Sequence, residues 1–371
     1  MIKKPLFNAT LVVMVCATFA NTNAASSSAD LVNAKKEAEA RGYLFLSKDD
    51  ILAKAKMEGK LRVYHALLGA INPLVEAFKR KYPFIQAQTE EFLGTDVYQR
   101  TLLELKAGRL RGVDVVRAPS DFYREYLPYL KKIDVLGMAK YGILSVPAEM
   151  IDPSTQNVVA VVSRIQVVAY NKNLIAPERV PGKWEDFLKP EFNGKKFLAE
   201  IRPTEIAALV PAWGLEKTLD FARKLAAQNP VWIRGAIRAL ASITAGDQAL
   251  FLGPNYDLVR AAMAKDANRS IGLKIVEPVP ARVSEELGIL ETAENPHAAL
   301  LWLEFLASPE GQKIIDKEQP GSASLFGANS LLRAETSGKQ LSLVTWADHA
   351  KLDQWQEKVI EAYGFPKADK S

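Results

Sequence analysis

An arginine lies inside the most apolar stretch of this chain, and this placement is the clearest chemical signal in the sequence. Residues 158–168 are mainly β-branched, a pattern typical of a buried strand. Arg164 belongs to this run, where its charge loses hydration unless a partner accompanies it. The residue therefore requires an anion, which is either a carboxylate of the protein or a bound ligand.

A second group of polar residues follows the predicted strands, at the edge where open α/β sheets bind ligands. Tyr64 and His65 end the first expected strand, so His65 is either a hydrogen-bonded loop residue or a ligand contact. Gly94 and Thr95 begin a helix, whose free N–H groups and positive dipole end suit an anion. Further candidates in comparable positions are Ser120, Arg202, Thr204, Arg234, Asn255 and Tyr256. For Arg234, near a helix start, a solvated charge is the alternative.

Motifs of the common enzyme classes are missing from the sequence. It contains no His-Glu-x-x-His, Gly-x-Ser-x-Gly, phosphate-loop or Gly-x-Gly-x-x-Gly pattern. The three histidines, His65, His297 and His349, are far apart in the sequence, and the last two are expected to be structural or solvated. We therefore predict a binding protein without a cofactor rather than an enzyme.

Size and charge point to a globular protein that binds a small molecule. A chain of 371 residues is long for one core and suits two lobes. Without Lys3 and Lys4, which belong to a segment expected to be removed, the net charge falls from +5 to +3. This charge is too small to indicate nucleic acid, and the sequence has no tract of lysine and arginine.

Residues 1–24 have the pattern of a secretory signal peptide. A basic start precedes the apolar run Leu6–Ala20, which is too short to span a membrane. The only cysteine in the sequence, Cys16, lies in this run, so cleavage near Ala24, or alternatively near Ala20, leaves a mature chain without thiols. We expect export to the periplasm.

Strands and helices alternate along the chain, which predicts mainly parallel sheets between helices. Residues 25–59 are expected to form a helical extension that stops at Gly59. The expected strands are 61–64, 84–92, 113–116, 158–168, 196–201, 248–252 and 271–279. The expected helices are 73–83, 95–108, 184–188, 206–213, 215–228 and 231–245, with others opening at 253 and 295. Asn72 and Thr95 are the predicted N-caps, with Pro73 in the first helical position.

Two stretches carry a family resemblance. The first runs from Ala-Tyr-Asn at 169–171 to Pro-Gly-Lys-Trp-Glu-Asp-Phe-Leu-Lys-Pro-Glu-Phe-Asn-Gly-Lys at 181–195, and the second is Phe-Leu-Ala-Ser-Pro-Glu-Gly-Gln at 305–312. They resemble bacterial ABC-transporter extracellular solute-binding proteins, in the branch related to ferric-iron-binding proteins. The resemblance covers most of residues 44–330. It implies the two-lobe type II periplasmic binding fold, in which each lobe is a mainly parallel sheet flanked by helices and a hinge joins them.

The resemblance also implies a division of the chain. We expect a signal peptide at 1–24, the extension at 25–59, a first lobe at 60–157 together with 276–371, and a second lobe at 158–275. The strand at 158–168 would carry the chain between the lobes, which close around a ligand by hinge motion. The implied partner is an ABC permease in the inner membrane, and the implied oligomeric state is a monomer.

Ferric-iron-binding relatives provide the decisive comparison for the ligand. They place a histidine near the position of His65, an anion-holding arginine at the position of Arg164, and two adjacent tyrosines where this chain has Asn255 and Tyr256. Because Fe³⁺ requires phenolate oxygens, the missing tyrosine favours an organic anion held directly, with Arg164 as its main contact.

We therefore expect a small anionic solute, such as an organic acid or a sugar phosphate. The main alternative is ferric iron with a synergistic anion, held by His65 and Tyr256. An alternative of another class is a sensory or interaction protein that presents its ligand to a membrane receptor. Permease and ATPase genes beside this one would distinguish transport from sensing.

Overall fold

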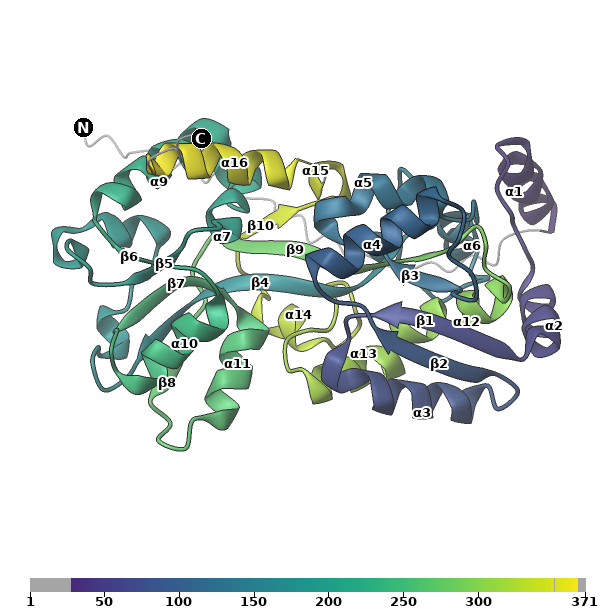
Figure 1. Ribbon diagram of the computed structural model, residues 1–371, viewed down its shortest axis with the longest axis horizontal. Helices are drawn as coiled ribbons and strands as arrows, with labels where there is room; N and C mark the ends of the chain where they lie inside the picture. The colour runs from purple at the N-terminus through teal and green to yellow at the C-terminus, as the bar shows by residue number, and fades with distance from the viewer. Residues whose placement is uncertain (1–27, 350, 366–371) are drawn as a thin grey trace, which may run out of the picture.

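Two α/β lobes lie side by side in the computed structural model, which describes residues 28–349 and 351–365 (Figure 1). The predicted signal peptide lies outside the described residues. Two long strands, β4 (Val159–Asn171) and β9 (Val279–Ile289), run through both lobes, and we call them the hinge strands. Within the described ranges, no helix has the length and apolar character needed to cross a membrane.

Shorter strands and a set of helices complete the two lobes. The other strands are β1 (Lys60–His65), β2 (Gln86–Glu91), β3 (Val115–Arg117), β5 (Leu198–Glu200), β6 (Val231–Ile233), β7 (Leu250–Asn255), β8 (Ile271–Lys274) and β10 (Leu341–Val344). The helices are α1 (Ser28–Ala40), α2 (Lys48–Glu58), α3 (Ile71–Lys81), α4 (Thr95–Lys106), α5 (Tyr123–Tyr126), α6 (Val135–Lys140), α7 (Thr204–Ala207), α8 (Val210–Trp213), α9 (Leu215–Ala227), α10 (Ala236–Ala245), α11 (Tyr256–Lys265), α12 (Pro296–Ala307), α13 (Pro309–Glu318), α14 (Leu331–Glu335), α15 (Trp346–His349) and α16 (Leu352–Tyr363).

The strands of the described chain join into one sheet that continues from lobe to lobe. Its order is β2-β1-β3-β9-β4-β7-β5-β6, with β10 beside β9 and β8 beside β4. β1 pairs in parallel with β2 and β3 in the first lobe, and β5 pairs in parallel with β6 and β7 in the second. The hinge strands pair with each other in antiparallel fashion. The predicted two-lobe α/β architecture is confirmed.

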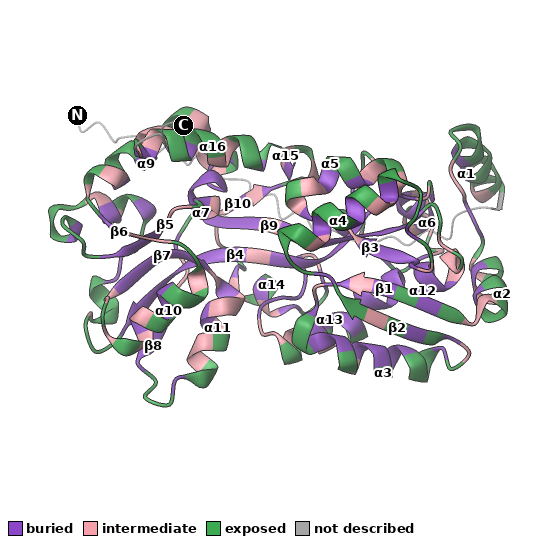
Figure 2. Ribbon diagram, viewed as in Figure 1, coloured by how far each residue is buried: buried purple, intermediate pink, exposed green. Residues whose placement is uncertain are grey.

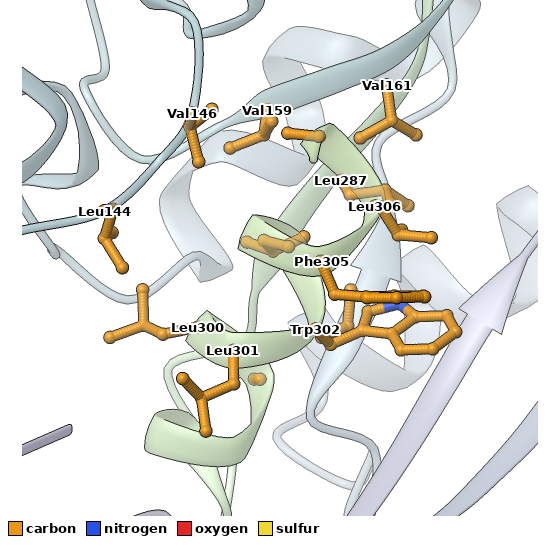
Figure 3. Close-up of a cluster of buried hydrophobic side chains, with 14 of the residues drawn as sticks. Leu144, Val146, Val159, Val161, Leu287, Leu300, Leu301, Trp302, Phe305 and Leu306 are labelled. Carbon is orange, nitrogen blue, oxygen red and sulfur yellow. The ribbon is translucent and has the colours of Figure 1, made fainter. Parts of the chain in front are cut away.

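The core of the first lobe surrounds α12. This helix is mostly apolar and almost wholly buried, as expected for a core helix rather than a surface one (Figure 2). Its Trp302 and Phe305 both pack against Phe78 of α3, with ring centroids 5.0 Å and 5.6 Å apart. Figure 3 shows Trp302 and Phe305 in one cluster with Val161 and Leu287 of the hinge strands. The first-lobe core therefore holds one end of the hinge.

The second lobe has its own core, which includes the expected short helix at 184–188. This segment is a 3-10 helix whose Trp184 and Phe187 are buried. Trp184 Nε1 donates a hydrogen bond to the carbonyl oxygen of Pro278, at 2.9 Å. Phe187 packs edge-to-face on Phe197, with centroids 5.0 Å apart. These contacts tie the loop that follows β4 to the segment that leads into β9.

Two predicted helix starts are wrong by one or two residues. α3 begins at Ile71, because a 3-10 turn at Leu68–Ala70 leads directly into it, so Asn72 lies inside the first turn instead of capping the helix. Pro73 is tolerated there because first-turn N–H groups have no acceptor within the helix. Thr95 is the first residue of α4, and Gly94, with φ of 99°, is its N-cap.

Three predictions in the second half of the chain need correction. Residues 231–233 form β6 instead of starting a helix, because they pair with β5. β7 continues to Asn255, so α11 begins at Tyr256 and not at 253. The strand expected at 271–279 divides into β8 and the start of β9, separated by a segment that includes Pro278, which has no N–H to give to a ladder. β9 is thus the return strand.

The C-terminal segment contacts both lobes. β10 pairs with β9, whereas Leu352, Val359 and Tyr363 of α16 join the core of the second lobe. Figure 1 shows α16 along α9. The lobe boundaries at 157/158 and 275/276 stay a prediction. The last helix, α16, packs against the second lobe.

Replacing Phe305 by alanine should destabilise the protein by about 3–5 kcal/mol, because it leaves a cavity beside Trp302 in the first-lobe core. Leu103→Ala is the control, since Leu103 is 63% exposed and its truncation should cost less than about 0.5 kcal/mol. Chemical denaturation monitored by circular dichroism measures both. Equal losses in the two variants would contradict the assignment of α12 as the core helix.

Candidate ligand-binding cleft

A cleft of about 850 Å³ lies between the lobes and over the hinge strands. The first lobe lines it with loops that follow β1, β2 and β3, and the second lobe with the loop that follows β5 and with α11. α16 and the segment after α13 complete the wall. The cleft thus lies at the carboxyl ends of the parallel strands, where open α/β sheets bind ligands.

Two arginines face each other on the floor of the cleft. Arg164 of β4 and Arg282 of β9 are direct partners in the antiparallel register of the hinge strands. Like charges directly opposite each other destabilise a sheet unless anions accompany them. Both residues line the cleft, so two positive charges lie next to each other on its floor.

The two floor arginines differ in their partners. Arg164 Nη1 lies 3.7 Å from Asp257 Oδ2 and donates to Ser322 Oγ at 3.1 Å. The side chain of Arg282 has no hydrogen bond or ion pair with any described residue, and its buried Nε has no acceptor. Burial, followed by the charge of Arg164, lowers the pKa of Arg282 to about 10. The guanidinium therefore stays charged at neutral pH. Glu286 and Asp257 oppose the lowering of its pKa, but neither forms an ion pair with it.

A third arginine is tied to an internal carboxylate. Arg117, at the end of β3, places Nε 3.2 Å from Glu285 Oε2 and donates from Nη1 to the Tyr98 hydroxyl at 2.7 Å. Burial would lower the pKa of Arg117, but Glu285 and Glu286 outweigh it and raise this pKa. Glu285 also accepts a hydrogen bond from the Ala66 N–H, at 2.7 Å. It thereby joins β9 to the first-lobe loop at the cleft.

Four of the predicted site residues line this cleft: Ser120, Arg164, Arg202 and Thr204. Ser120 donates from Oγ to Glu286 Oε1 at 3.0 Å. Thr204 donates from Oγ1 to Gln356 Oε1 of α16, at 2.9 Å. The first-lobe loop, the hinge and the second-lobe loop therefore bring polar side chains to one space.

Tyr64, His65, Gly94 and Thr95 do not line the cleft. His65 is 4% exposed, and its Nδ1 accepts a hydrogen bond from the Leu67 N–H at 3.1 Å. Burial lowers the pKa of His65 to about 4. Tyr64 stacks on Phe92, with ring centroids 5.3 Å apart. These residues support the loops, and their neighbours Ala66 and Leu93 line the cleft instead.

Asn255, Tyr256 and Arg234 also lie outside the cleft. Asn255 accepts a hydrogen bond from Gln166 Nε2 at 3.0 Å, across the β4–β7 pair. Tyr256 is buried and donates its hydroxyl to Glu335 at 3.3 Å, and burial followed by Glu335 raises its pKa to about 12. Arg234 lines a separate cavity of about 440 Å³, which it shares with Arg202.

The other two histidines contact carboxylates and do not line the cleft. His297 Nδ1 contacts Glu58, and His349 Nε2 lies 3.3 Å from the buried Glu286. Within the described ranges, no group of three or more histidine, aspartate or glutamate side chains is arranged to hold a metal. No described residue that lines the cleft is a histidine or a tyrosine.

The sequence contained a signal for Arg282 that the prediction did not use. Like Arg164, Arg282 interrupts a run of apolar residues, here 279–283, but the expected return strand stopped at 279. Arg117 directly follows the expected strand 113–116, so its place at the sheet edge could have been inferred. The roles of Asp257 and Glu285 could not have been inferred, because they depend on which arginine each carboxylate contacts in the folded chain.

Stability should fall between pH 6.5 and pH 4, because the unfolded state then protonates His65 while the folded state holds it neutral. His65→Asn keeps an acceptor for the Leu67 N–H and removes this titration. We expect the melting midpoint of the wild type to drop a few degrees more than that of the variant between pH 7.5 and pH 5 in differential scanning calorimetry. Parallel curves would contradict the burial of a neutral imidazole.

Comparisons with known proteins identify the family and the fold. A family model for bacterial extracellular solute-binding proteins matches residues 122–352. The chain is 25% identical over 165 residues to iron uptake protein A1 of Synechocystis sp., and the alignment spans 41% of this chain but only 46% of that protein.

Solved structures share the fold across most of the chain. The Trichodesmium FutA (IdiA) structure with iron and citrate ligands has a TM-score of 0.65 at 19% identity and covers 83% of this chain and 100% of that one. The apo ferric ion-binding protein A of Pasteurella haemolytica has a TM-score of 0.63 at 18% identity, with coverage of 83% and 100%. Because the family model matches more than half of the 371 residues, this chain belongs to the family of bacterial extracellular solute-binding proteins, which is not a family of enzymes.

Proposed function

We propose that this protein captures a small organic anion between its two lobes and delivers it to an ABC permease. The observation that carries the proposal is the register pair of Arg164 and Arg282 on the floor of the cleft. Arg282 has a charged guanidinium whose side chain forms no hydrogen bond or ion pair with any described residue. A ligand anion supplies that counter-ion.

Charge and hydrogen-bonding geometry both favour an anion at this point. It would reduce the repulsion between the two guanidinium groups and accept hydrogen bonds from both. Arginine presents several N–H donors in a planar fork, which matches the oxygens of a carboxylate or a phosphate. Each such charge-assisted hydrogen bond contributes about 1.5–3 kcal/mol.

The position of the pair on the hinge strands links binding to closure. An anion held there is next to the 66–69 loop of the first lobe and α11 of the second. When the lobes approach, the ligand gains contacts from both sides, and only this difference in affinity can shift the population toward the closed form. The closed form would be the one that a permease recognises.

Ferric iron is the second candidate, because the relatives named above are iron uptake and ferric ion-binding proteins. His65 and Tyr256 give it little support, since each is bonded inside the protein and neither lines the cleft. Iron would therefore arrive with an organic chelator, and the floor arginines would hold the chelator's oxygens. Such a complex would lack the visible charge-transfer band of a tyrosinate–iron bond.

Other parts of the functional assignment rest on the family and on the sequence. We propose that residues 1–24 direct export to the periplasm and that the mature protein is a monomer with neither catalytic activity nor affinity for nucleic acid. A sensory protein that presents its ligand to a membrane receptor would need the same cleft. Stimulation of a permease–ATPase complex by the loaded protein would favour transport.

Arg282→Met should weaken binding of the best anion in a thermal-shift panel by roughly ten- to a hundredfold, because it removes the charge-assisted contact. The panel contains organic acids, sugar phosphates, and ferric iron with and without citrate. The free variant should be at least as stable as the wild type, because the like-charge pair is gone.

Arg124→Met is the matched control, since Arg124 is exposed and does not line the cleft. Titration calorimetry provides the affinities. Unchanged affinity in Arg282→Met would remove the anion role of the floor, and a shift only with ferric iron would favour the second candidate.

A further inference from the structure

The charges that line the cleft nearly cancel. Its cationic side chains are Arg117, Arg164, Arg202, Arg260, Lys265 and Arg282, and its carboxylates are Asp121, Asp257, Glu285, Glu318 and Asp353. Six cations thus face five carboxylates, an excess of one positive charge among the lining residues. A cleft made for a multiply charged anion would carry a larger excess.

On the floor of the cleft, arginines and carboxylates are matched in single ion pairs. Glu285 Oε2 lies 3.2 Å from Arg117 Nε, and Asp257 Oδ2 lies 3.7 Å from Arg164 Nη1, whereas Arg282 has no described partner. Glu286, on the same strand, contacts Ser120 and His349. Two of the three floor arginines therefore have an internal carboxylate, and one is left for the ligand.

The backbone keeps the carboxylate of Glu285 in place. Glu285 has a φ of 55°, in the left-handed region that a residue with a side chain rarely adopts. The register of the hinge strands pairs Val162 with Ser284 and Ala160 with Glu286, and Glu285 falls between these pairs. Its other oxygen accepts the Ala66 N–H. A conformation of this kind persists only when its surroundings fix it, so Glu285 stays at the floor when a ligand enters.

We infer that the cleft selects a monoanionic head group, such as a single carboxylate, and that Glu285 and Asp257 reject anions of higher charge. This inference rests on the proposed function. A second negative charge on the head group would lie near these two carboxylates without a free arginine to balance it. In a partly buried site this repulsion is stronger than in water. Unfavourable charges of this kind are a common source of specificity.

The test compares three anions that each contain four carbon atoms: butyrate, butanesulfonate and butyl phosphate at pH 8. Butyrate and butanesulfonate are monoanions with planar and tetrahedral heads, and butyl phosphate is a dianion with a tetrahedral head. Titration calorimetry on the wild type should give butyrate and butanesulfonate a dissociation constant about tenfold or more lower than that of butyl phosphate. Preference for butyl phosphate would overturn the inference.

Glu285→Gln and Asp257→Asn then test the two residues. Glu285→Gln keeps an oxygen for the Ala66 N–H, and each variant removes one carboxylate charge from the floor. We expect butyl phosphate to gain about tenfold relative to butyrate in each variant. A merely structural role would weaken all three anions equally and leave their ratio unchanged, which would refute the role of that residue.

Glu125→Gln is the control, since Glu125 is exposed and lies outside the cleft lining. Asp257→Asn keeps the test decisive if Glu285→Gln folds poorly. Binding of none of the three anions to the wild type would reject both the proposed function and this inference. Binding of all three with equal affinity would reject the inference alone.

Discussion

Two like charges face each other across the strands on which both lobes turn. Arg164 and Arg282 occupy one register pair of the hinge strands, at the base of the interlobe cleft. Guanidinium groups remain charged at neutral pH, so this pair requires anions nearby. Asp257 provides one of them, and we propose that an anionic solute provides the other.

The fold is arranged to hold this pair at a fixed place. The hinge strands consist mainly of β-branched and other apolar residues and are buried on both faces. The cores of the first and second lobes pack around their two ends. In the first lobe α12 forms this packing, and in the second the aromatic cluster around Trp184 forms it. The polar loops at the strand ends then surround the floor, because the parallel strands of both lobes end at the cleft.

The sequence alone predicted the architecture, and it predicted part of the cleft. Period and composition predicted most of the strands, though not β6, β10 or the extent of β9. They also led to Arg164, Ser120, Arg202 and Thr204, since each follows or interrupts a recognisable strand. His65 and Tyr256 differ, because their neighbours Ala66 and Asp257 line the cleft instead. Successive side chains near a strand end face different ways, so an error of one residue moves a candidate from the cleft to the core. The local sequence pattern does not determine whether such a side chain faces the cleft or the core. The packing of the two lobes determines it.

The most direct test of the arginine floor is a crystal structure of the mature protein soaked in sodium bromide. Bromide is a monoanion that can be located by its anomalous scattering without any assumption about the natural ligand. We predict the strongest anomalous peak of the cleft within contact distance of the Arg164 and Arg282 guanidinium groups. Bromide only at exposed surface lysines and arginines, with none at the floor, would contradict the anion-binding role of this pair.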